Sequence, residues 1–182
     1  MTNEERQLLG KAQRINAWDS KKLYYCVGKK HQRSWTVKRG EVFFVDLGEN
    51  VGSEENKIRP VVIIQSNSYN ISSPVFTCAI ISTSPATLPD IQIPITGTYT
   101  YTDPNGKSAT LSGTIDLGQI KTIGKERIIS AKICKLSAEM SELDTKLLNI
   151  LGLSYIVKKK DNVISSLSGK IDYLKKQLKD KA

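Results

Sequence analysis

The sequence contains few residues of the kinds that metal sites, disulfides and thiol nucleophiles require. Its three cysteines, Cys26, Cys78 and Cys134, lie far apart without a Cys-x-x-Cys pair, and its only histidine is His31. This set does not favour a His/Cys metal site, and a Cys nucleophile ordinarily needs a nearby His. Scattered thiols are typical of proteins in a reducing compartment. We therefore expect a protein without metal or other cofactor.

Long apolar segments are also missing. No apolar run approaches the roughly 20 residues that a membrane helix requires. The first residues, Met1–Arg6, are charged and lack the apolar core of a signal peptide. A length of 182 residues fits one domain with appendages and suffices to bury a core. We expect a cytoplasmic protein that does not contact a membrane.

The positive charge is concentrated at the two ends of the chain. The whole sequence carries +9, but residues 1–36 carry +5, residues 37–157 carry −1 and residues 158–182 carry +5. Basic ends attract phosphates through counterion release, but they are equally compatible with solvated helix faces. Composition leaves both interpretations open.

Residues 1–36 form the first predicted segment, a basic helical extension. Thr2 and Glu5 fit a capping box, and Leu8, Ala12 and Ile15 fall on one helix face. The pattern breaks at Asp19-Ser20 and again at Gly28-Lys29-Lys30. We expect residues 20–36 to form a second short helix followed by a linker.

Residues 37–157 predict a small β-barrel, because short strands follow one another with turn formers between them. The run Val61–Ile64 does not alternate, which indicates a strand buried on both sides. Asp103-Pro104-Asn105-Gly106 is a turn between two strands of a hairpin. The expected strands are 41–47, 59–65, 75–82, 92–95, 98–102, 108–112, 114–120 and 128–134.

Two helices are expected after the strands. Ser137 is placed to cap the first, and Gly152 to end it. The second follows Lys158–Asp161 and makes residues 158–182 a basic amphipathic extension. It carries a 3-4 spaced apolar stripe, formed by Ile164, Leu167, Ile171, Leu174 and Leu178. Packing of this stripe on the N-terminal helix and self-association as a coiled coil both remain open.

Several motifs, in order, resemble the PemK/MazF family of type II toxins over roughly residues 37–154. They are Lys38-Arg39-Gly40-Glu41-Val42, Gly52-Ser53-Glu54, Arg59-Pro60-Val61-Val62-Ile63, Gln119-Ile120-Lys121-Thr122-Ile123 with Lys125-Glu126-Arg127, and Leu151-Gly152-Leu153. The resemblance implies an SH3-like barrel that forms a homodimer and is inhibited by a cognate antitoxin. It also implies a metal-independent, sequence-selective endoribonuclease that cleaves single-stranded mRNA, leaving a 2′,3′-cyclic phosphate and a 5′-hydroxyl.

The resemblance also implies roles for particular residues. Arg59 would stabilise the phosphorane, because a guanidinium stays charged and its forked donors match phosphate. The family usually has a Thr at the end of the third strand, where this chain has Ser82 followed by Thr83; these two alternate in direction, so at most one faces the site. Many relatives have an acid where this chain has Gly118, and Asp116, on the same strand face, is the candidate substitute.

The residues expected to contact RNA lie mostly in the loop before Arg59, with one on a later strand. They are Gly52, Ser53, Glu54, Asn56, Lys57 and Gln119. Two alternatives remain beside the nuclease, because fold alone does not fix function. One is a non-enzymatic toxin on the same barrel, like those that poison gyrase. The other is a regulator that binds RNA or DNA through its basic ends.

Overall fold

The computed structural model describes residues 1–103 and 106–180, without the side chain of His31. The predicted turn residues Pro104 and Asn105 therefore lie outside the described residues. The chain consists of two compact units, Met1–Glu142 and Leu143–Ala182. The predicted three-part division at residues 37 and 158 stays a prediction.

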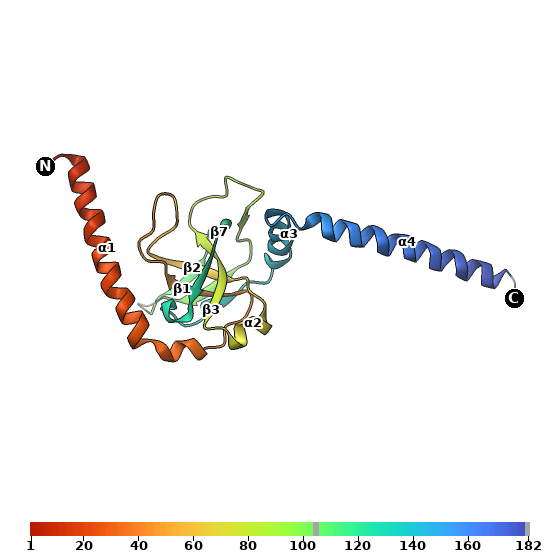
Figure 1. Ribbon diagram of the computed structural model, residues 1–182, viewed down its shortest axis with the longest axis horizontal. Helices are drawn as coiled ribbons and strands as arrows, with labels where there is room; N and C mark the ends of the chain where they lie inside the picture. Colours follow the sequence, from red (N-terminus) through yellow and green to blue (C-terminus); the bar gives the residue numbers. More distant parts are fainter. Residues whose placement is uncertain (104–105, 181–182) are drawn as a thin grey trace. The chain divides into compact units, whose positions relative to one another are not determined.

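The first unit is built around a sheet of six strands in the order β4-β7-β3-β2-β1-β8, and the neighbouring pairs are antiparallel. A separate hairpin pairs β5 with β6. Figure 1 shows the sheet curling on itself, with helices flanking it. The strands are β1 (Glu41–Asp46), β2 (Ile58–Ile63), β3 (Val75–Ser82), β4 (Gln92–Pro94), β5 (Tyr99–Thr102), β6 (Ser108–Leu111), β7 (Thr114–Gly124) and β8 (Cys134–Lys135).

The helices lie at both ends of the chain and in one β-strand connection. They are α1 (Asn3–Gly28), α2 (Asn67–Ser72), α3 (Met140–Ile150) and α4 (Ser154–Lys179), with short 3-10 helices η1 (Lys30–Ser34) and η2 (Lys125–Arg127). The prediction of a mainly β protein with flanking helices is confirmed. The SH3-like barrel is present as a half-barrel.

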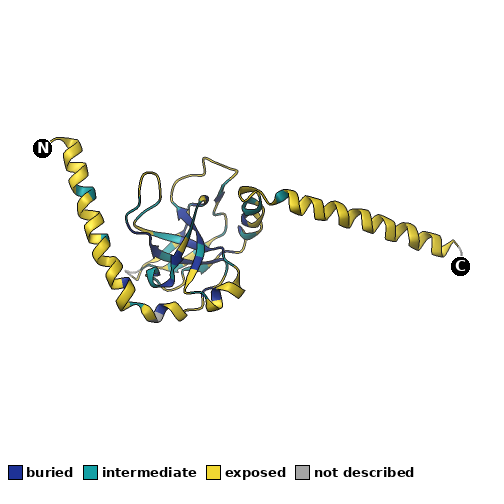
Figure 2. Cartoon of the chain, in the orientation of Figure 1, coloured by how far each residue is buried: buried dark blue, intermediate teal, exposed yellow. Residues whose placement is uncertain are grey.

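The core fills the inner face of the curled sheet, as the buried residues in Figure 2 show. It is made of apolar side chains from four strands and three adjoining segments: Val37, Phe43, Val45, Leu47, Val61, Ile63, Phe76, Cys78, Ile80, Ile123 and Ile128. Val62 is also fully buried, although it points away from this cluster. The prediction that the run after Pro60 is buried on both sides is confirmed.

The predicted strand at residues 128–134 is wrong for most of its length. The segment runs beside β1, and the N–H groups of Ile129 and Ile133 donate to the Phe44 and Val42 carbonyls at 3.0 and 2.9 Å. Between them the ladder is broken, because the Ser130 hydroxyl accepts from the Phe44 N–H at 2.9 Å. A side chain thus replaces the backbone partner, and only Cys134–Lys135 pairs as a strand.

The N-terminal segment is one continuous helix, not two. Thr2 and Glu5 form the predicted capping box. Asp19 and Ser20 do not break the helix, because both form bonds within it. Asp19 pairs with Lys22 at 2.8 Å, and the Ser20 hydroxyl donates to the Asn16 carbonyl at 3.3 Å.

The face of α1 that contacts the sheet is not its aliphatic face. Leu8 and Ile15 are 66% and 40% exposed. The contacting side chains follow a 3-4 spacing on the neighbouring face of the helix: Lys11, Arg14, Trp18, Lys21 and Tyr25. Charged and aromatic side chains therefore form the contacts of α1 with the rest of this unit.

The last residues of the first unit begin α3, which carries the buried Leu143 and ends near Gly152; this glycine has φ of +67°, as the predicted helix stop requires. Helix α3 begins at Met140, so Ser137, the predicted cap, lies too far before its start. Helix α4 begins at Ser154 and not after Lys158–Asp161 as predicted, so these residues lie inside it. No residue described in α4 is buried, and the packing of its apolar stripe stays a prediction.

Candidate active site

Arg59 lies at the opening of β2, where the loop from β1 returns to the sheet. The base of that loop is closed by two hydrogen bonds of 2.7 Å, from the Leu47 N–H to the Lys57 carbonyl and from the Lys57 N–H to the Gly48 carbonyl. Lys57 has φ of +62°, an uncommon conformation for a residue other than glycine. The Arg59 side chain is 40% exposed, and its Nε lies 2.9 Å from a Glu55 carboxylate oxygen.

Ser82 is the last residue of β3, the strand that pairs with β2. Val61 of β2 pairs with Ile80 of β3 in an antiparallel register. Extending that register by two residues sets Arg59 opposite Ser82 on the same sheet face. Ser82 is partly buried, whereas Thr83 is exposed beyond the strand. The geometry therefore favours Ser82 over Thr83 as the hydroxyl beside Arg59.

Asp116 lies on β7 at a break in the pairing with β3. Ile80 pairs with Asp116, but Ala79 pairs with Ile120, so three residues of β7 bulge out. Within this bulge the Gly118 N–H donates to the Asp116 carboxylate at 2.8 Å. A side chain built on Gly118 would place its Cβ 3.1 Å from the same carboxylate oxygen. The Asp116 carboxylate thus lies beside the position that a side chain at residue 118 would occupy.

Two of the loop residues expected to bind RNA, Ser53 and Glu54, contact β7. Gln119 donates to the Ser53 carbonyl at 3.1 Å and accepts from the Glu55 N–H at 2.7 Å. Glu54 pairs with Lys121 at 2.7 Å. A hollow of about 470 Å³ lies here, lined by Val51, Ser53, Glu54, Gly118, Gln119, Ile120 and Lys121. Gln119 therefore positions the loop.

The other three loop residues expected to bind RNA are Gly52, Asn56 and Lys57, for which no side-chain contact with β7 is described. Gly52 has φ of +61°, and nothing lies within 4 Å of the place a Cβ would take, so its conformation is what favours glycine there. Asn56 is partly buried next to Lys57. The side chains of Asn56 and Lys57 form no hydrogen bond or ion pair with the described residues.

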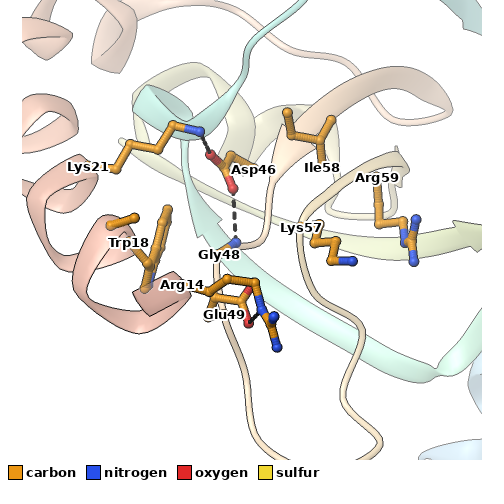
Figure 3. Close-up of a pocket in the computed structure, with 10 residues that line it drawn as sticks. Arg14, Trp18, Lys21, Asp46, Gly48, Glu49, Lys57, Ile58 and Arg59 are labelled. Carbon is orange, nitrogen blue, oxygen red and sulfur yellow. Dashed lines mark hydrogen bonds and ion pairs between the residues drawn. The ribbon is translucent and has the colours of Figure 1, made fainter. Parts of the chain in front are cut away.

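On the other side of the loop, Arg59 and Lys57 open onto a second hollow, of about 420 Å³, between the loop and α1 (Figure 3). Arg14, Trp18 and Lys21 line it from the helix. Asp46 and Glu49 are the acidic residues in its wall. The hollow is thus lined by four basic and two acidic side chains, which gives it a surplus of positive charge.

Asp46 holds the helix to the end of β1. Its buried carboxylate accepts from the Tyr25 hydroxyl at 2.8 Å and from the Gly48 N–H at 3.0 Å, and it pairs with Lys21 at 2.7 Å. Burial alone would raise the pKa of Asp46, but the bonds from Lys21, Tyr25 and Gly48 outweigh it, and the pKa is lowered. The same burial, together with Asp46, raises the pKa of Tyr25 well above its usual value.

Sequence reasoning did not find Glu55, Lys121, Asp46 or the contacting face of α1. The signal for that face was present as the 3-4 spacing of basic and aromatic residues in α1. The partners of Glu55 and Lys121 are set by loop geometry, which no local pattern reveals. Within residues 1–103 and 106–180, no group of three His, Cys, Asp or Glu side chains is placed to hold a metal ion.

Comparison with known proteins identifies the family. Residues 38–151 match the family described as "PemK-like, MazF-like toxin of type II toxin-antitoxin system". This match spans more than half of the chain. The chain belongs to the PemK/MazF toxin family. One curated relative of this PemK/MazF chain is the endoribonuclease EndoA of Bacillus subtilis (strain 168), 37% identical over 106 residues, which are 58% of this chain and 85% of that protein.

Solved structures similar to this PemK/MazF chain match about two thirds of it. An endoribonuclease from a mycobacterial species is 22% identical with a TM-score of 0.49, covering 65% of this chain and 94% of that one. MazF from Deinococcus radiodurans is 15% identical with a TM-score of 0.49, covering 65% of this chain and 98% of that one.

No helix among the described residues is long and apolar enough to span a membrane.

Proposed function

We propose that this chain is the toxin of a type II toxin-antitoxin system and acts as a metal-independent, sequence-selective endoribonuclease on single-stranded mRNA. The observation that carries the proposal is the place of Arg59, a half-exposed guanidinium at the mouth of the half-barrel beside a hollow with surplus positive charge. Family membership and a relative named as an endoribonuclease support it. Cutting mRNA would stop translation and growth.

In the proposed reaction the 2′-hydroxyl of the RNA attacks the adjacent phosphorus. The bond from phosphorus to the 5′-oxygen breaks and this oxygen takes up a proton from water, which leaves a 2′,3′-cyclic phosphate and a 5′-hydroxyl. Arg59 stabilises the negative charge on the phosphoryl oxygens, because its donors are fixed before the charge develops. Its Nε is engaged by Glu55 in the structure, but the two terminal nitrogens of the guanidinium remain to meet the phosphate.

We propose Ser82 as the hydroxyl that holds the scissile phosphate or the 2′-hydroxyl, with Thr83 as the less favoured neighbour. Asp116 is the proposed base that accepts the proton of the 2′-hydroxyl. Its carboxylate lies beside the side chain that Gly118 lacks, where many relatives have an acid. Asp116 lies on β7 and Arg59 on β2, with β3 between them, so both side chains would have to reach the same phosphodiester step.

The proposed partners follow from the family and the site. A cognate antitoxin would cover the groove, and two copies of the chain would form a homodimer. The RNA would contact Gly52, Ser53, Glu54, Asn56 and Lys57 in the loop, while Gln119 holds the loop in place. We propose a cytoplasmic location, where mRNA is available as substrate.

The purified protein should cut a long RNA at a small set of sequences in excess EDTA, because none of the proposed steps uses a metal. Fragments are mapped by primer extension with increasing protein concentration. A non-enzymatic toxin on the same barrel predicts intact RNA at every concentration. Intact RNA would therefore contradict the nuclease, provided that the antitoxin has been removed. Cutting that occurs only when a divalent metal is added would contradict the mechanism.

A further inference from the structure

The helix α1 adds a second wall to the hollow beside Arg59, and the contacts of that wall are fixed by the fold. Trp18 packs on Gly48, where a Cβ would lie 2.2 Å from the indole ring. The Arg127 guanidinium lies 5.0 Å from the centre of the same ring. Together with Asp46, these contacts attach the middle of α1 to the loop between β1 and β2. The position of Arg14, one turn before Trp18, is set by this attachment.

Glu49 in that loop is paired mainly by Lys11. The Lys11 ammonium lies 3.1 Å from a Glu49 carboxylate oxygen and 2.9 Å from the Asn50 carbonyl. Arg14 reaches the same carboxylate only through Nε at 3.4 Å, and its side chain is 52% exposed. The terminal nitrogens of Arg14 therefore keep donors that no acceptor among the described residues satisfies.

Lys57 faces the same hollow from the opposite wall. Its ammonium forms no hydrogen bond or ion pair with the described residues, and its backbone is held at φ of +62°. Residues kept in such sparsely populated conformations cluster at functional sites. Arg14, Lys57 and Arg59 together present more donors than the protein's own acceptors use. An anion next to the Arg59 phosphate would satisfy them.

We propose that Arg14 and Lys57 form a subsite for a backbone phosphate of the RNA, one that flanks the phosphate held by Arg59. This inference rests on the proposed function, because it takes Arg59 as the scissile-phosphate group. The subsite lengthens the RNA path along α1 and explains how the basic N-terminal extension serves the barrel. Contacts to phosphate position a nucleic acid without reading its sequence, so the subsite contributes affinity and not sequence preference.

The test measures binding of 2′-O-methyl RNA, which cannot be cleaved, by fluorescence anisotropy over a range of salt concentrations. Arg14→Ala should weaken binding of a long strand about tenfold at low salt and reduce the salt slope by about 0.7, the contribution of one phosphate on a single strand. The loss on a short strand, with one nucleotide on either side of the scissile step, should be at least severalfold smaller. The cut sites on cleavable RNA should stay the same.

Arg6→Ala is the matched control, since Arg6 is an exposed arginine of the same helix, two turns before Arg14. It should change neither affinity nor slope. A second pair of variants tests the attachment of α1. Gly48→Ala meets the Trp18 ring and should reproduce the Arg14→Ala loss, whereas Gly106→Ala, at a glycine with φ of +78° but open space and no proposed RNA contact, should not.

Three results would overturn the subsite. The first is an unchanged affinity and slope in Arg14→Ala, and the second is an equal loss on short and long strands, which indicates a structural effect. The third is unchanged RNA binding with weakened binding of an oligoglutamate peptide, which would assign the hollow to an acidic protein segment. If wild-type protein cuts no RNA but the slope falls as expected, the subsite stands and the nuclease proposal fails. If the wild-type protein cuts RNA but Arg14→Ala changes neither affinity nor salt slope, the nuclease proposal stands and the subsite fails.

Discussion

Arg59→Ala is expected to lower the rate of RNA cleavage at saturating substrate by about 100- to 1,000-fold, the usual effect of removing one fixed donor from a developing oxyanion. Arg59→Lys should recover only part of this loss, because an ammonium keeps the charge without the forked geometry that matches phosphate. The measurement is the single-turnover rate on a fluorogenic RNA that contains one mapped cleavage site. Binding of uncleavable RNA should change much less than this rate.

The control for this variant is its stability. The Arg59 side chain is 40% exposed, and its one ion pair among the described contacts is with Glu55. Exposed pairs contribute about 0–1 kcal/mol, so the free energy of unfolding should change by less than that. Full cleavage activity in Arg59→Ala would remove Arg59 from the reaction. Urea titration of the variant shows whether the protein stays folded, and therefore whether a lower cleavage rate reflects the reaction and not unfolding.

Asp46→Ala is expected to lower the free energy of unfolding by about 3 kcal/mol, because it removes the charged acceptor of three donors, two of which lie on the buried residues Tyr25 and Gly48. The donors are the Tyr25 hydroxyl, the Lys21 ammonium and the Gly48 N–H. Urea unfolding monitored by tryptophan fluorescence measures the change, since Trp18 lies on Gly48. Asp19→Ala, which removes an exposed pair with Lys22, should change it by less than about 1 kcal/mol.

The Asp46 effect should depend on pH in one direction. The pKa of Asp46 is lowered in the folded protein, so its contribution is complete above its pKa in the unfolded chain, about 3.9. That contribution is lost as the pH falls through the folded pKa. The difference between wild type and Asp46→Ala should therefore be constant from pH 7 to about pH 5 and shrink below about pH 4. A difference that grows on acidification would contradict the pairing of Asp46.

The regular elements of the barrel were largely predictable, because they follow local patterns. The strand at Val75–Ser82 matches its prediction at both ends, and the hairpin of β5 and β6 falls where turn residues separate two short runs. The segment after Ile128 was predicted as a strand because its composition is apolar. It lost that structure because the Ser130 hydroxyl takes the place of a backbone acceptor, and a single side chain of this kind leaves no periodic signal.

The site was predictable only as far as its motif reached. The Arg59-Pro60 motif located the start of β2, whereas the facing of Arg59 and Ser82 stays a prediction, because the pairing of β2 with β3 ends at Val61 and Ile80. The packed face of α1 was not predictable, because charged and aromatic side chains form it and not the aliphatic residues that an apolar pattern marks. The true face depends on Asp46 and Glu49, which lie far from it in sequence and become its neighbours only when the loop folds.

The central claim, cleavage by the RNA's own 2′-hydroxyl without metal, is tested most directly with two matched RNA strands in excess EDTA. One strand contains a single mapped cleavage site, and the other has 2′-deoxy sugar at the nucleotide whose 2′-hydroxyl attacks. The account predicts that the first is cut to a fragment ending in a 2′,3′-cyclic phosphate, detected by mass spectrometry, and that the second stays intact. Cleavage of the deoxy-substituted strand at the same site would contradict it.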